Sequence, residues 1–163
     1  MKEKRIYVAS SWRNSHQPRV VDVLRACGHD VYDFRHPEPG NNGFHWSDVD
    51  PAWKDWTPAQ FRAALDHPIA VSGRRLDFDA MKWADVCVLV LPCGRSAHIE
   101  AGWFIGAGKP VLILLEDGGS ESELMYGIVA DDGGVGYLCA NLDEVVDALS
   151  KDQVLVNLRG EEP

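Results

Sequence analysis

The sequence predicts an α/β fold in which five parallel strands form a doubly wound sheet with helices on both faces. Three observations support this prediction. Short apolar runs recur along the chain, segments of helical period separate them, and turn residues stand between the two. A length of 163 residues suits a single domain with its own core. We expect this domain to span residues 1–150, with an insertion at about 35–57 and a tail from 151 to 163.

The first strands and the helix between them predict one β-α-β unit. Arg5–Ser10 is typical of a buried strand, residues 18–27 of a helix with one apolar face, and Asp30–Phe34 of a second strand. Gly28 stands where a helix C-terminus commonly requires a left-handed residue. Such a unit implies two parallel strands joined by a right-handed crossover.

The rest of the chain continues the alternation, and strand order 2-1-3-4-5 is expected, as in flavodoxin-like and Rossmann-like folds. Two helix starts have clear signals: Thr57 followed by Pro58, and Asn141. The further helices expected are 57–66, Leu76–Trp83, the one that carries Glu100 with Ser96 as its N-cap, and Leu142–Leu149; the further strands are Asp85–Leu91, Pro110–Leu115 and Gly136–Cys139.

A segment rich in proline, glycine and tryptophan interrupts the pattern between residues 35 and 57. Long irregular segments in compact domains are commonly lids or binding loops. Trp46, Trp53 and Trp56 either stack on a ligand or anchor the segment to its own domain, and anchoring is the commoner use of such residues.

Charge and hydropathy exclude several classes of partner. The net charge of −9 argues against a nucleic-acid polymer, because phosphate neutralisation supplies most of that affinity. No apolar stretch is long enough to span a bilayer, so no membrane partner is expected. The N-terminus lacks the apolar region of a signal peptide, and we expect a cytoplasmic protein.

Cysteine and histidine usage predicts no metal site, and the chemistry expected of this chain requires no organic cofactor. The four cysteines form no CxxC pair, and we expect them to be reduced thiols. The six histidines show neither HxH nor HExxH spacing, so no metal site is expected.

Glu100 is the strongest candidate for chemistry. It follows the turn after the apolar run of residues 86–91, at the edge of the sheet where open α/β sheets bind ligands. A carboxylate fixed there can attack a sugar anomeric carbon or stabilise an oxocarbenium-like transition state. The alternative is that the acid only complements the helix dipole. Gly102 and Gly106 each cost about 1 kcal/mol in a helix, and they predict a close approach of this helix to the sheet.

Several segments resemble the nucleoside 2-deoxyribosyltransferase family, whose relatives include the 2′-deoxynucleoside 5′-monophosphate N-hydrolases. They are Ile6-Tyr7-Val8-Ala9, Asp77, and the run from Ala84-Asp85 through Glu100-Ala101-Gly102 to Gly108-Lys109-Pro110. The similarity covers roughly residues 5–149.

The resemblance implies roles for four residues. Glu100 would be the nucleophile that forms a glycosyl-enzyme intermediate, Tyr7 would position it, and Asp77 would contact the base. Met125 lies in a segment similar to one that reaches a neighbouring subunit's site, with ordinary loop packing as the alternative. A homo-oligomer with shared sites is therefore expected.

The chain departs from the family pattern at Gly94, where the transferases usually carry a sugar-binding aspartate. Gly94, Arg95 and Ser96 at a helix N-terminus form a candidate anion site, to which Ser10 and Arg13 could add donors. These residues predict recognition of a 5′-phosphate, unless the arginines are solvated or paired with acids. The departure leaves open whether a second base or water accepts the sugar.

Asp77 and Asp79 are the candidate acids near the base. Either could protonate the leaving nitrogen if its pKa were raised, with Asp79 as the second choice. The alternative is that both residues lie near a helix start and cap it.

The sequence therefore predicts an enzyme that cleaves the N-glycosidic bond of a (deoxy)nucleoside or nucleoside 5′-monophosphate. Two other readings stay open, because one fold hosts many functions. One is a non-catalytic nucleotide-sensing module, and the other is a glycohydrolase acting on NAD or a related ADP-ribosyl compound.

Overall fold

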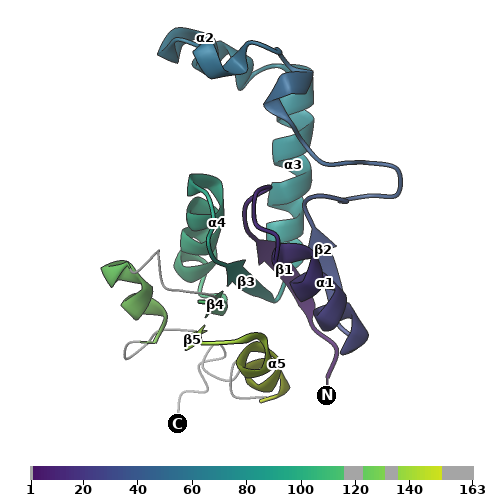
Figure 1. Ribbon diagram of the computed structural model, residues 1–163, viewed down its shortest axis with the longest axis vertical. Coiled ribbons are helices and arrows are strands. Elements are labelled where there is room, and N and C mark those ends of the chain that lie inside the picture. The colour runs from purple at the N-terminus through teal and green to yellow at the C-terminus, as the bar shows by residue number, and fades with distance from the viewer. Residues whose placement is uncertain (1, 116–122, 131–135, 152–163) are drawn as a thin grey trace. The chain divides into compact units, whose positions relative to one another are not determined.

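The computed structural model describes residues 2–115, 123–130 and 136–151. The chain divides into two compact units, one formed by residues up to Tyr32 and from Trp83 onward, the other by Asp33–Lys82. The first contains the sheet (Figure 1). The expected insertion at residues 35–57 lies inside the second unit, and the expected tail, apart from residue 151, lies outside the described residues.

The sheet has the predicted order, β2-β1-β3-β4-β5. The pairs β1–β3, β3–β4 and β4–β5 are parallel, and Tyr7 of β1 lies opposite Cys87 of β3. The short apolar runs form these strands because both faces of a parallel sheet are covered. The five strands are β1 (Arg5–Ala9), β2 (Asp30–Asp33), β3 (Val86–Val90), β4 (Val111–Leu114) and β5 (Gly136–Cys139).

One face of the sheet packs against α1 (Gln17–Ala26) and α5 (Leu142–Ser150). The core here combines alternate strand residues with the apolar stripes of both helices. Gly28 takes a φ of +86° directly after the C-cap of α1, and the Asn141 side chain accepts a hydrogen bond from Glu144 N at 3.0 Å. Both predicted helix signals are confirmed.

The helix α4 (Arg95–Gly106) contacts β1, β3 and β4. It packs through alanine and phenylalanine side chains, whereas Gly102 and Gly106 are exposed. Apart from the backbone of the helix itself, no described atom lies within 4 Å of a Cβ added to either. The predicted glycine-mediated approach to the sheet is therefore wrong, because the helix turns these glycines away from its packed face. The buried residues of α4 are Ala97, Ala101 and Phe104.

The start of α4 also differs from the prediction. Gly94, not Ser96, is the N-cap, so the helix begins one residue after the glycine. Glu100 is consequently the sixth helical residue and lies in the second turn. The helix dipole acts mainly in the first turn, so it contributes less at Glu100 than the sequence suggested.

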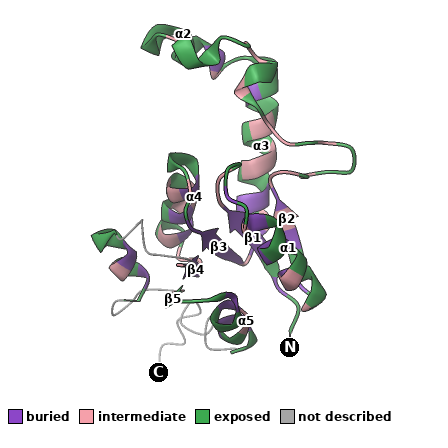
Figure 2. Ribbon diagram, viewed as in Figure 1, coloured by how far each residue is buried: buried purple, intermediate pink, exposed green. Residues whose placement is uncertain are grey.

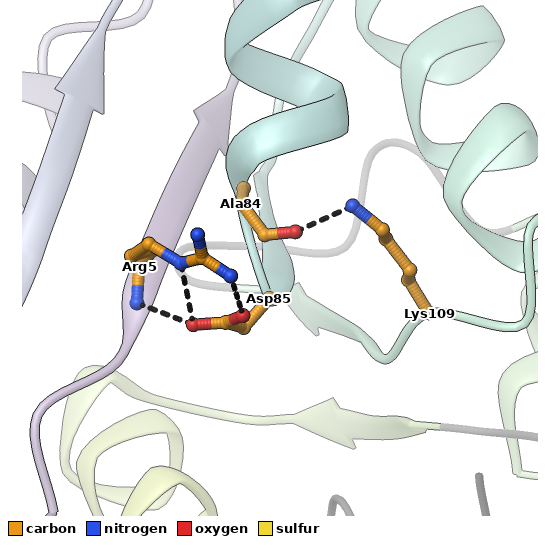
Figure 3. Close-up of polar contacts among 4 residues, drawn as sticks. All are labelled: Arg5, Ala84, Asp85 and Lys109. Atoms are coloured by element: carbon orange, nitrogen blue, oxygen red, sulfur yellow. Dashed lines mark hydrogen bonds and ion pairs between the residues drawn. The ribbon is translucent and has the colours of Figure 1, made fainter.

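The amino ends of β1 and β3 are clamped by an ion pair (Figure 3). Arg5 donates from its backbone N, Nε and terminal nitrogen to the Asp85 carboxylate, over 3.0, 3.1 and 2.6 Å. The hydrogen bond from Arg5 holds the pKa of Asp85 below its usual range. Lys109 Nζ donates to Ala84 O at 2.6 Å and ties the start of β4 to the same corner.

The second unit contains α2 (Pro58–Ala64) and nearly all of α3 (Pro68–Trp83). Thr57 caps α2 as predicted: its hydroxyl accepts from Gln60 N, and the Gln60 side chain accepts from Thr57 N. The helix α3 begins eight residues before the predicted start at Leu76. Gly73 lowers the helical propensity of that first half, but it lies under Phe44, whose Cβ would be 2.9 Å from an added Cβ.

Aromatic side chains hold the tryptophan-rich segment together within this unit. Trp46 makes edge-to-face contacts with Phe44, Trp56 and Phe61, with ring centroids 4.7, 5.5 and 5.6 Å apart. Trp56 Nε1 donates to Asp50 Oδ2 at 2.6 Å. These contacts show anchoring for Trp46 and Trp56, although the segment and α2 remain largely exposed (Figure 2).

None of the helices in the described ranges has both the length and the apolar character that a bilayer span requires.

Replacement of Asp85 by asparagine should lower the free energy of unfolding by about 1 kcal/mol at pH 7, because the charged partner of Arg5 is lost while both groups keep some solvent screening. Because the pKa of Asp85 is lower in the folded state than in the unfolded state, its carboxylate stabilises the fold at pH values above the usual carboxyl pKa. The difference between wild type and Asp85→Asn should therefore shrink as the pH falls below about 4. Urea denaturation at several pH values measures this difference in the free energy of unfolding.

Asp147→Asn, on the exposed side of α5, is the matched control and should show no comparable difference. Equal stability of wild type and Asp85→Asn at pH 7 would contradict the clamp.

Candidate functional site

The candidate site lies at the carboxyl ends of β1 and β3 in the first unit. These strands are neighbours in the sheet although a helix, a strand and the whole second unit separate them in sequence. The strand order reverses between them, because the chain goes from β1 to the edge strand β2 and returns to β3. Open α/β sheets bind ligands at this kind of switch point.

Tyr7 is fixed inside the unit, with 1% of its surface exposed. Its ring stacks on Tyr32, with centroids 5.3 Å apart and planes 14° apart, and contacts Phe104 of α4 at 5.7 Å. Cys87 lies directly opposite it in the neighbouring strand. Packing on these sides leaves the Tyr7 ring little rotational freedom.

Glu100 is half-buried on α4, the helix that packs on β1 and β3. Burial first, and then the negative charge of Glu100, raises the pKa of the Cys87 thiol well above its usual range. Cys87 and Tyr7 are paired in β3 and β1, the two strands on which α4 packs.

The turn that leads into α4 exposes the predicted anion-binding residues. Gly94, Arg95 and Ser96 are all exposed, and no side chain caps this helix N-terminus. The first backbone N–H groups of a helix have no intrahelical acceptor. The turn can therefore present N–H donors, the Ser96 hydroxyl and the Arg95 guanidinium to an anion.

The loop after β1 is tied to this turn mainly by Asn14, which is 3% exposed. Its Nδ2 donates to Val90 O at 3.2 Å and to Pro92 O at 3.0 Å. Its Oδ1 accepts from the backbone N of His16 at 2.7 Å and of Gln17 at 3.1 Å. One amide side chain thus joins the end of β3 to the start of α1.

Sequence reasoning missed Asn14. The available signal was its place three residues before Gln17 and four before Pro18, a pattern typical of a helix start.

Ser10, expected to contact substrate, donates its hydroxyl to Val90 O at 2.9 Å, so it also links the loop after β1 to the end of β3. Arg13 is exposed on this loop.

A cluster of three side chains lies beside the turn. Cys93 Sγ is 3.5 Å from His98 Nδ1, and His98 Nε2 is 2.8 Å from the Tyr126 hydroxyl. Tyr126 belongs to η3 (Leu124–Val129) and is buried. Because Tyr126 and His98 are 28 residues apart, local spacing gave no signal for this cluster.

Met125, expected to reach a neighbouring subunit, is 63% exposed on η3, next to the buried Tyr126.

Asp77 and Asp79 lie in the second unit, in the last half of α3. They are the tenth and twelfth residues of that helix, so the alternative that they cap its start is wrong. Asp79 is exposed, and a hydrogen bond from Lys82 at 2.9 Å holds its pKa below the usual range. A proton donor needs a raised pKa, so Asp79 is poorly suited to that role. Asp77 is half-buried.

Within the described residues, no three histidine, cysteine, aspartate or glutamate side chains form a group that could hold a metal ion. The chemistry that the site can offer comes from a carboxylate, a fixed phenol and a turn of hydrogen-bond donors. Such a set can bind an anion at one point and present a nucleophilic oxygen at another.

Neither a protein-family model nor a curated protein matches the chain. Among solved structures, a 2-deoxyribosyltransferase from the psychrotolerant bacterium Bacillus psychrosaccharolyticus is similar, with 20% identity and a TM-score of 0.52. That match covers 94% of this chain and 96% of the other. The CMP N-glycosidase of Clostridium botulinum is similar at 20% identity and a TM-score of 0.47, over 91% and 97% of the two chains. The first likeness shows a shared fold.

Replacement of Asn14 by alanine should lower the free energy of unfolding by about 2–3 kcal/mol, because this buried side chain makes four hydrogen bonds to backbone groups and all four would be lost. Denaturant titration measures the loss, with Asn42→Ala on the exposed part of the second unit as the control. A change below about 0.5 kcal/mol, the usual range for surface substitutions, would contradict the joining role of Asn14.

Proposed function

We propose that the protein cleaves the N-glycosidic bond of a deoxynucleoside or nucleoside 5′-monophosphate, with Glu100 as the nucleophile. The observation that carries the proposal is the position of this carboxylate. It is half-buried on α4, the helix that packs on β1 and β3 at the switch point of the sheet, and its charge contributes to the raised pKa of the Cys87 thiol.

The reaction needs two displacements at the sugar C1′. A Glu100 oxygen forms a bond to C1′ while the bond from C1′ to the base nitrogen breaks, and the base leaves after taking up a proton. Water or a second base then attacks C1′ and releases the carboxylate. The part given to Asp77 near the base comes from the family resemblance alone.

Tyr7 positions the nucleophile in this proposal. Its ring is held by Tyr32 on one side and Phe104 on another, and Phe104 belongs to the same helix as Glu100. A fixed ring keeps its hydroxyl in one place without the cost of ordering it during the reaction. Tyr7 therefore suits the role that the resemblance implies.

The exposed turn at the start of α4 suits the 5′-phosphate. A phosphate there would meet backbone N–H groups, the Ser96 hydroxyl and the Arg95 guanidinium, and Arg13 lies on the loop that Asn14 ties to this turn. Gly94 adds no side chain to obstruct the anion. The absence of a carboxylate at Gly94 also removes a repulsive charge from this position.

Two further points accord with the proposal. The solved structure with the shared fold is described as a 2-deoxyribosyltransferase. The exposed Met125 suits the family resemblance, and we propose a homo-oligomer in which it reaches the site of a neighbouring copy.

Glu100→Gln should lower the rate of base release by about 10³-fold or more, because the amide is a poor nucleophile while its size preserves the fold. The measurement is liberated base from a panel of nucleosides and 5′-monophosphates, with and without an acceptor base. Glu123→Gln, an exposed residue ahead of η3, is the control and should retain the wild-type rate. Equal rates for wild type and Glu100→Gln would remove Glu100 from the mechanism.

Arg95→Ala should raise KM about 10- to 100-fold for a nucleoside 5′-monophosphate, as expected from the loss of a charge-assisted contact of about 1.5–3 kcal/mol. The same change should leave KM for the corresponding nucleoside nearly unaltered, which serves as the internal control. A parallel rise for both substrates would place the phosphate elsewhere.

A further inference from the structure

The four cysteines differ sharply in their surroundings, and two are unsuited to reaction. Cys87 and Cys139 are buried thiols. Burial, followed by the charge of Glu100, raises the pKa of Cys87 well above its usual range, and burial raises that of Cys139 to about 11. Because the thiolate is the reactive form, both should be inert.

The other two are partly exposed and stand at opposite ends of helices. Cys27 is the C-cap of α1, where the negative end of the helix dipole opposes a thiolate. Cys93 directly precedes Gly94, the N-cap of α4, where the positive end favours one. They form a matched pair of similar exposure and contrasting surroundings.

The imidazole ring of His98 further distinguishes the surroundings of Cys93 from those of Cys27. The sulfur lies 3.5 Å from His98 Nδ1 and 3.9 Å from Nε2. These distances are nearly equal. If the sulfur made a hydrogen bond in line with Nδ1, its distance to Nε2 would be much longer. The sulfur therefore lies over the face of the ring. A thiolate there would be in direct contact with the charge of a protonated imidazole.

The two ring nitrogens have partners in other directions. Nδ1 is 3.0 Å from Gly94 O and Nε2 is 2.8 Å from the Tyr126 hydroxyl. When His98 is protonated, both N–H groups can therefore donate, to the carbonyl and to the phenol oxygen. The imidazolium keeps its place beneath the sulfur without having to turn toward it.

Cys93 also adjoins the candidate anion site. In sequence, it immediately precedes the exposed turn of residues 94–96. A group attached to its sulfur would therefore lie next to the donors of this turn.

We propose that Cys93 is a modification site for small carbon electrophiles of the haloacetamide class, activated by His98 and by the start of α4, and that its adduct obstructs the proposed phosphate site at residues 94–96. In the reaction, the thiolate sulfur forms a bond to the electrophilic carbon, the halide leaves with the electron pair of the broken bond, and the thiol proton passes to solvent. The obstruction rests on the proposed function, whereas the selective modification does not.

The first test is the rate of labelling of the folded, full-length chain by substoichiometric iodoacetamide, followed by peptide mass spectrometry. Cys93 should react at least about tenfold faster than Cys27, as expected for a thiol with greater thiolate character. His98→Asn should slow Cys93 by about tenfold without altering Cys27. Tyr126→Phe keeps the ring but removes the hydroxyl, and should slow Cys93 less.

Equal labelling of Cys93 and Cys27 in the wild type would overturn the proposal, as would an unchanged Cys93 rate in a folded His98→Asn protein. The wild-type comparison needs no variant to fold.

The second test measures base release after alkylation. Alkylated wild type should lose activity, while Cys93→Ser should retain it before and after the same treatment, because the sulfur itself takes no part in catalysis. Full activity of protein alkylated at Cys93 would overturn the obstruction. Absence of base release from every untreated form would instead contradict the proposed function. The labelling result would still hold, because it does not depend on catalytic activity.

Discussion

The alignment of β1 beside β3 is the constraint on which the rest of the site depends. The two strands are far apart in sequence, and the chain holds them together at both ends. Arg5 and Asp85 clamp their amino ends, and the Asn14 amide joins the loop after β1 to the carbonyls at the end of β3. Between these two joins, Tyr7 lies opposite Cys87.

The functional side chains take their positions from this pair of strands. The helix α4 packs on both strands and carries Glu100, while the turn before it exposes the donors of Gly94, Arg95 and Ser96. The proposed nucleophile and the proposed anion site are thus six residues or fewer apart in sequence, on one rigid element. Short rigid elements hold such groups more accurately than loops.

Much of the fold could be predicted because its signals are local. Apolar runs defined the strands, and the caps at Thr57 and Asn141 defined two helix starts. Predictions failed where a neighbour distant in sequence decides the outcome. A side chain at residue 73 of α3 would collide with Phe44, and Gly102 faces away from the sheet because alanines occupy the packed face.

The site was predictable only in part for the same reason. Glu100 could be located because its strand, turn and helix are consecutive, whereas the contact of His98 with Tyr126 spans 28 residues and left no pattern. Asn14 had only a weak capping signal, and its role depends on carbonyls 76 and 78 residues away. Contacts of this kind follow from tertiary structure.

The most direct test of the account is the mass of the intact protein after incubation with a 2′-deoxy-2′-fluoro nucleoside 5′-monophosphate. The fluorine slows breakdown of a glycosyl-enzyme intermediate, because it withdraws electrons from the oxocarbenium-like transition state. We expect a mass increase equal to one fluorinated sugar phosphate, located by peptide mapping at Glu100. An adduct at another residue, or base release with no adduct at all, would contradict the central claim.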